Sequence, residues 1–142
     1  MQFKIQHKSQ LELTLMDIKA RRILIIHADD AIKEMLLLCL ETIPNCRAIA
    51  VSSGIEGIKQ AKEVDAILLD VDEAIPDLGW REIARCLQQD PLTNSIPIIL
   101  LTATPRSDEL IKFQLVNEVK AIAKTFDLMA TAERVADLLN WN

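Results

Sequence analysis

Four polar residues, each close behind a short apolar run, carry the chemistry that this sequence can offer. Asp70 follows Ala-Ile-Leu-Leu, Asp72 comes two residues later, Thr102 follows Ile-Ile-Leu-Leu, and Lys124 follows Ala-Ile-Ala. A carboxylate can act as a nucleophile or as a ligand for a hard cation. A hydroxyl and an ammonium group can stabilise negative charge that develops in a reaction. These residues act together only if the fold brings the ends of the runs to one place.

The elements that must position them are predicted by the alternation of apolar runs and amphipathic stretches from residue 22 onward. We expect five strands, over residues 23–26, 48–51, 66–69, 96–101 and 119–123. Helices are expected over about residues 31–41, from Gly54, over 80–89, over 107–118 and from Asp127 onward. Because the runs are continuous rather than alternating, the strands are predicted to be covered on both faces.

Five β–α units predict an α/β fold, a doubly wound five-stranded parallel sheet with helices on both faces. The expected arrangement is flavodoxin-like, with strand order 2-1-3-4-5 and right-handed crossovers. In such sheets ligands meet side chains at the carboxyl ends of the strands, near the point where the strand order reverses. Asp70, Thr102 and Lys124 are therefore predicted to converge on one edge, with His27 and Asp29 delivered by the first strand.

The composition indicates a folded protein that stays inside the cell. The 142-residue chain has a net charge of −5, and its Lys and Arg residues do not cluster as nucleic-acid binding requires. No apolar run approaches the roughly 20 residues that span a bilayer, and the N-terminus lacks the pattern of a secretory signal. Three cysteines are too few and too scattered for a disulfide framework or a zinc site. We therefore expect a cytoplasmic protein that binds neither nucleic acid nor a membrane.

Residues 1–21 lie outside the repeated pattern and are predicted to form an N-terminal extension, ahead of one domain over residues 22–142. A capping box from Ser9 to Glu12 would begin a helix. Equally, the alternation of apolar residues between Phe3 and Leu15 would suit a hairpin. The sequence leaves both alternatives open.

The stretch DAILLDVDEAIPDLGWREIARCLQQDPLTNSIPIILLTA, with the later AKTFD, resembles the receiver domains of two-component response regulators. The resemblance covers residues 22 to about 140 and includes the family's acceptor aspartate and the lysine-containing turn after the fifth strand. It implies that Asp70 accepts a phosphoryl group, that Lys124 supplies a fixed positive charge, and that Thr102 donates a hydrogen bond to a phosphoryl oxygen. It also implies Mg²⁺ as the cofactor, held by carboxylates.

The sequence departs from the family at two positions that usually carry adjacent acidic residues and help to hold the metal. These positions are His27 and Ala28; Ala28 offers no ligand, and a histidine nitrogen suits Mg²⁺ poorly. The predicted metal ligands are therefore Asp29, Asp70 and Asp72. By itself His27 is interpreted as an ordinary polar residue at a strand end, and Asp29 has a rival role as the N-cap of the first helix.

The leading hypothesis is a stand-alone receiver, not an enzyme, that accepts a phosphoryl group on Asp70 in a phosphorelay and signals by protein–protein binding. The resemblance implies a sensor histidine kinase or phosphotransfer protein and a downstream protein target as partners, and it allows a homodimer. One alternative is a pseudo-receiver, an interaction module that is not phosphorylated, which His27 and Ala28 favour. Another is a phosphatase, because Asp70-Val71-Asp72 is similar to the D-x-D motif of haloacid-dehalogenase-type enzymes, although that motif normally lies on the first strand.

Overall fold

The computed structural model describes residues 20–142 of the chain. Both alternatives for the N-terminal extension, the helix and the hairpin, lie outside the described residues. The first element described is a strand that begins at Arg21. No helix in the described part of the chain combines the length and the apolar character needed to cross a bilayer.

Five parallel strands form one sheet in the order β2-β1-β3-β4-β5, which confirms the predicted fold class and strand order. The strands are β1 (Arg21–Ile26), β2 (Cys46–Val51), β3 (Ala66–Asp70), β4 (Ile98–Thr102) and β5 (Lys120–Ala123). The order reverses between β1 and β3, because the chain passes first to β2 on one side of β1 and then to β3 on the other. The carboxyl ends of β1 and β3 therefore lie at the switch point where such folds place their sites.

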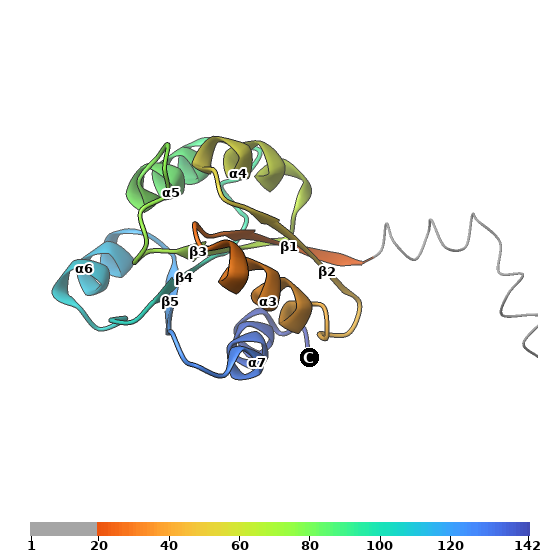
Figure 1. The fold of residues 1–142 in the computed structure, drawn as a ribbon. Helices are drawn as coiled ribbons and strands as arrows, with labels where there is room; N and C mark the ends of the chain where they lie inside the picture. Colours follow the sequence, from red (N-terminus) through yellow and green to blue (C-terminus); the bar gives the residue numbers. More distant parts are fainter. Residues whose placement is uncertain (1–19) are drawn as a thin grey trace, which may run out of the picture.

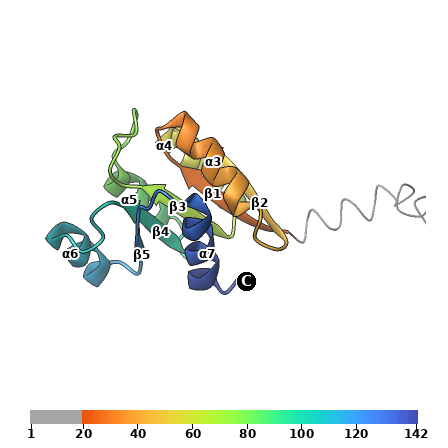
Figure 2. The same cartoon turned by 60° about the horizontal axis from the view of Figure 1, so that its bottom comes forward.

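Helices cover both faces of the sheet, as Figures 1 and 2 show. They are α3 (Asp30–Leu40), α4 (Gly54–Gln60), α5 (Trp80–Gln89), α6 (Asp108–Val116) and α7 (Leu128–Leu139), with a short 3₁₀ turn, η1 (Ala61–Glu63), after α4. Helices α3 and α7 pack on one face, and α4, α5 and α6 pack on the other. Four of the five helices begin at a residue whose side-chain oxygen accepts a backbone N–H of the first turn: Asp29, Ser53, Ser107 and Asp127.

The continuous apolar runs are explained by the two cores. Along β1, Ile23 and Ile25 face the core under α3 and α7, whereas Leu24 and Ile26 face the core under α4 and α5. All four side chains are buried, so neither face of the strand has room for a polar residue. A polar side chain can first appear where the strand ends, and this is what positions the site.

Candidate functional site

Asp70 is the last residue of β3 and the most deeply buried carboxylate of the site. Only 1% of the residue is exposed, because β3 lies in the middle of the sheet between β1 and β4. Its Oδ2 accepts the backbone N–H of Glu73 at 2.9 Å, which closes the turn after the strand. Its Oδ1 is left facing the ends of the neighbouring strands.

Lys124 reaches Asp70 from the end of β5. Its backbone N–H donates to the carbonyl of Thr102 at 2.8 Å, which extends the β4–β5 ladder by one residue and fixes where the side chain starts. Its Nζ then lies 2.6 Å from Asp70 Oδ1 and 3.3 Å from Asp72 Oδ2. Partial burial acts to lower the pKa of Lys124, but the hydrogen bonds and charges of Asp70 and Asp72 outweigh it and raise that pKa above its usual value. The ammonium group is therefore a permanent positive charge beside Asp70.

Thr102 ends β4, and its hydroxyl is buried with 1% of the residue exposed. Its Oγ1 donates to Asp72 Oδ1 at 2.7 Å, and the backbone N–H of Ala103 donates to Asp72 Oδ2 at 2.7 Å. Partial burial acts to raise the pKa of Asp72, but these two hydrogen bonds and then Lys124 lower it below its usual range. Asp70, Thr102 and Lys124 thus share one edge as predicted, with Asp72 between the threonine and the lysine.

His27 follows β1, at a strand end as the sequence predicted, and is buried with 1% of the residue exposed. Its Nδ1 accepts the backbone N–H of Asp29 at 3.0 Å, which means that this nitrogen carries no proton. The proton of the neutral ring is then on Nε2, which lies 3.7 Å from Asp70 Oδ1. This N–H is buried and lies near the carboxylate, beyond hydrogen-bond distance, at a position where the family usually places an acidic side chain.

The three carboxylates predicted to hold Mg²⁺ are not assembled into a cation site. Asp29 Oδ1 accepts the backbone N–H of Ile32 at 3.0 Å, so it serves as the N-cap of α3, the rival role. Both oxygens of Asp72 already accept hydrogen bonds from β4 and its loop. Within residues 20–142 no group of three His, Cys, Asp or Glu side chains is arranged to hold a metal ion. Since Ala28 supplies no ligand and His27 turns a donor toward Asp70, the residues present do not fit a magnesium ion.

A further aspartate, Asp77, was not identified from the sequence and shapes the loop beside the site. Its carboxylate accepts from Ser53 Oγ at 2.8 Å, Gly54 N–H at 2.7 Å and Ile55 N–H at 3.0 Å, which ties the β3–α5 loop to the start of α4. The backbone donors of Ile55 and Gly54, and then Ser53, lower the pKa of Asp77 to about 2. No local sequence pattern predicts that Asp77 ties the loop to α4, because its hydrogen-bond partners lie more than twenty residues earlier in the chain.

The sequence and the structure were compared with those of known proteins. No family model matches the chain. A curated relative, the transcriptional regulatory protein AfsQ1 of Streptomyces coelicolor, is 35% identical over 88 residues, which are 62% of this chain and 36% of the relative. The chain thus matches only about a third of the length of that relative.

Two solved structures extend the comparison to most of the chain. The N-terminal domain of a response regulator receiver protein from Methanoculleus marisnigri is 28% identical, with a TM-score of 0.62 over 83% of this chain and 95% of that one. The receiver domain of the sensor histidine kinase PA1611 from Pseudomonas aeruginosa, which holds a magnesium ion in its active-site cleft, is 24% identical, with a TM-score of 0.68 over 86% of this chain and 97% of that one. Strand order, site placement and these similarities agree: the chain has the fold of response-regulator receiver domains and resembles them in sequence.

Proposed function

We propose that this receiver domain accepts a phosphoryl group on Asp70 and signals by binding a partner protein, without being an enzyme. The observation that carries the proposal is the contact of 2.6 Å between the ammonium of Lys124 and the buried carboxylate of Asp70. Phosphoryl transfer depends on positioning and on stabilising the charge of the phosphoryl oxygens. A fixed cation beside a fixed carboxylate supplies both requirements.

The proposed reaction forms one bond and breaks one bond at phosphorus. A carboxylate oxygen of Asp70 attacks the phosphorus of a phosphohistidine or a small phosphodonor, and the bond to the donor breaks with its electron pair on the donor atom. The product is an acyl phosphate, whose added negative charge lies beside Lys124. The Nε2–H of His27 lies 3.7 Å from Asp70 Oδ1, within reach of an oxygen added there. The natural donor would be a sensor histidine kinase or a phosphotransfer protein.

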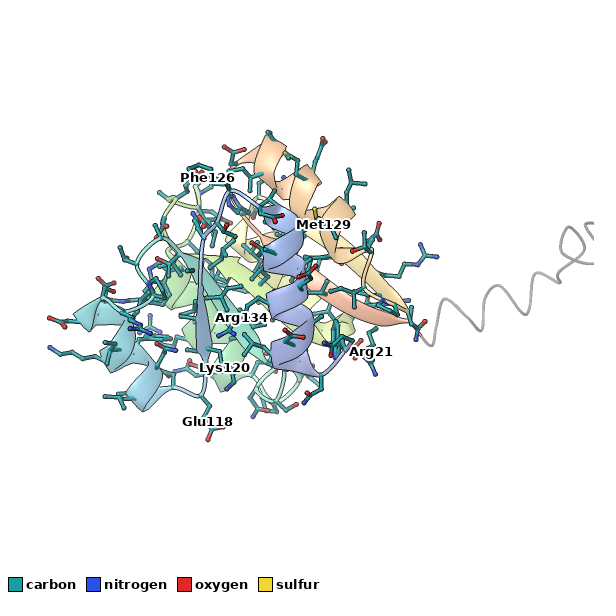
Figure 3. The ribbon with its side chains drawn as sticks, turned by 90° about the horizontal axis from the view of Figure 1, so that it is seen from below. Arg21, Glu118, Lys120, Phe126, Met129 and Arg134 are labelled. Carbon is teal, nitrogen blue, oxygen red and sulfur yellow. The ribbon has the colours of Figure 1, made fainter. Side chains whose placement is uncertain are left out.

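The partner surface that we assign to this function is the face formed by α6, β5 and α7, seen in Figure 3 with Lys120 on β5 and Arg134 on α7. A hollow in this face is lined by Ala121 and Ile122, with Arg106 and Arg134 among its polar residues. Ala121 is the small residue that replaces the aromatic side chain often found there in the family. An apolar side chain of a partner, flanked by carboxylates, would complement this hollow.

Phosphotransfer to the purified chain tests the proposal directly. Acetyl phosphate, with and without Mg²⁺ or Mn²⁺, is expected to add the mass of one phosphoryl group, measured on the intact protein. Asp70→Asn must abolish the addition, while Asp77→Asn, a carboxylate of the same loop that faces α4 instead, must leave it intact. No incorporation under any metal condition would remove the acceptor role.

The second candidate function, a pseudo-receiver that binds its partner without phosphorylation, is favoured by one specific observation. The two positions where the family usually carries acidic residues are filled by Ala28 and by His27, whose Nε2–H faces Asp70 Oδ1. The same mass measurement separates the two candidates, because a folded pseudo-receiver gains no phosphoryl group from acetyl phosphate.

A further inference from the structure

Three donors converge on one carboxylate at the edge of the sheet, and that carboxylate belongs to the chain itself. Thr102 Oγ1 donates to Asp72 Oδ1 at 2.7 Å, Ala103 N–H donates to Asp72 Oδ2 at 2.7 Å, and Lys124 Nζ lies 3.3 Å from the same Oδ2. We call these three donors the anion cradle: the hydroxyl of Thr102, the backbone N–H of Ala103 and the ammonium of Lys124. A hydroxyl, a backbone N–H and an ammonium group are typical ligands of an oxyanion.

The cradle stands beside Asp70, because one of its three donors, Lys124, contacts both carboxylates. Lys124 Nζ bridges the two carboxylates, at 2.6 Å from Asp70 Oδ1 and 3.3 Å from Asp72 Oδ2. Asp72 is an anion at neutral pH, because Thr102 and Ala103 and then Lys124 lower its pKa against the opposing effect of burial. The cradle is therefore filled by a charge of the same sign as a phosphoryl group.

The contact also restrains the loop that follows β4. Thr102 Oγ1, while it donates to Asp72, accepts the backbone N–H of Thr104 at 3.1 Å. The carbonyl of Thr104 in turn accepts the N–H of Ser107 at 3.1 Å, and Ser107 caps α6. A continuous set of hydrogen bonds thus runs from Asp72 to the start of α6, at one side of the face assigned above to partner binding.

We infer that, in the unmodified protein, the Asp72 carboxylate occupies the cradle of Thr102, Ala103 and Lys124 in place of an external anion. Through Thr102 it also holds the β4–α6 loop in the hydrogen-bonded arrangement described above. A tetrahedral oxyanion such as phosphate enters the cradle only when the Asp72 side chain withdraws. Asp72 and a bound phosphoryl group compete for the same donors, so the residue sets both the resting arrangement of the loop and the access of anions to it. This inference stands whether or not Asp70 is phosphorylated.

Inorganic phosphate is the probe that tests it, with amide NMR of the full chain as the readout. In the unmodified protein the Ala103 amide is expected to exchange slowly with solvent and to show no saturable shift with phosphate. In Asp72→Ala the same amide should exchange at least about tenfold faster, and phosphate should bind at least about tenfold more tightly, because the tethered competitor is gone. Asp72→Asn, which keeps the shape and removes the charge, must change in the same direction by a smaller factor.

The matched control is Glu73→Gln, which removes one negative charge from the adjacent, exposed position of the same loop. It must leave both the exchange of Ala103 and the affinity for phosphate unchanged. Equal phosphate affinity in the unmodified protein and Asp72→Ala, or unchanged protection of Ala103, would overturn the inference. Failure of the acceptor proposal has a different signature, since it leaves Asp70 without added mass while the response of Asp72→Ala to phosphate is unaffected.

Discussion

Replacing Lys124 with methionine removes the ammonium group from a site whose partner carboxylate has no access to water. The side chain of Asp70 is 0% exposed and that of Lys124 is 26% exposed. In Lys124→Met the Oδ2 of Asp70 still accepts the N–H of Glu73 at 2.9 Å. Of the other site residues described above, only His27 remains near Oδ1, with its Nε2 3.7 Å away. The substitution therefore leaves a buried charge without its cation.

The magnitude follows from that burial. Removing one partner of a buried ion pair costs about 3–5 kcal/mol. The partial exposure of the lysine and its hydration in the unfolded chain reduce this figure, so we expect Lys124→Met to lower the free energy of unfolding by about 2–3 kcal/mol. Asp70→Asn removes the buried charge instead and leaves Lys124 free to turn toward Asp72 or solvent. We expect it to cost less than about 1 kcal/mol.

Urea unfolding at neutral pH, followed by circular dichroism, measures these differences by linear extrapolation. The variant Lys120→Met is the matched control, because Lys120 is an exposed lysine on β5, the strand that Lys124 directly follows, and its cost should stay within about 0.5 kcal/mol. In the double variant Asp70→Asn with Lys124→Met, the cost should fall back toward that of Asp70→Asn alone. Equal costs for Lys124→Met and Asp70→Asn would show that the buried carboxylate is not what the ammonium stabilises.

Three further predictions concern packing, pH and metal binding. Gly57→Ala should lower the free energy of unfolding by about 1–3 kcal/mol, because a Cβ at this position would lie 2.6 Å from Cδ1 of the buried Ile26. Asp77 has a pKa of about 2 in the folded protein against 3.8 for an unperturbed carboxyl, so its contribution to stability is full above about pH 4 and lost as the pH falls through about 2; the melting temperature should therefore fall less steeply over that interval in Asp77→Asn. His27→Asp combined with Ala28→Asp should create saturable binding of Mg²⁺, measured by quenching of tryptophan fluorescence, that the unmodified chain lacks.

Each of these has its own check. Gly79→Ala places a Cβ where no atom lies within 4 Å, so this variant should be neutral, and a comparable loss in both variants would refute the packing argument. For Asp77, identical slopes of the melting temperature against pH in both proteins would show that its hydrogen bonds do not contribute. For the metal, quenching of equal strength before and after the double substitution would show that the acidic pair is not what this site lacks.

Much of the fold follows from local patterns in the sequence. A run such as Ile23 to Ile26 has no polar position, so as a strand it must be covered on both faces, and parallel strands in turn require helical crossovers. The helix starts were also readable, since Asp29, Ser53 and Ser107 are short polar residues ahead of amphipathic stretches. The expected fourth strand began two residues early, at Ile96 rather than Ile98, because apolar character alone does not locate the first ladder hydrogen bond.

The placement of Asp70, Thr102 and Lys124 was likewise determined by the sequence, because parallel pairing brings the last residues of neighbouring strands to one edge. What each side chain contacts was not. Asp72 meets Thr102 across 30 positions of sequence, and His27 approaches Asp70 although α3, β2, α4 and β3 lie between them in the chain. Once the chain leaves the ladder, the direction of a side chain depends on which donors the loops bring near it, and those donors come from segments that only the tertiary structure places side by side. The sequence by itself determined which residues reach the edge of the sheet, and the fold decided that one of them, Asp72, takes the donors expected to serve a phosphoryl group.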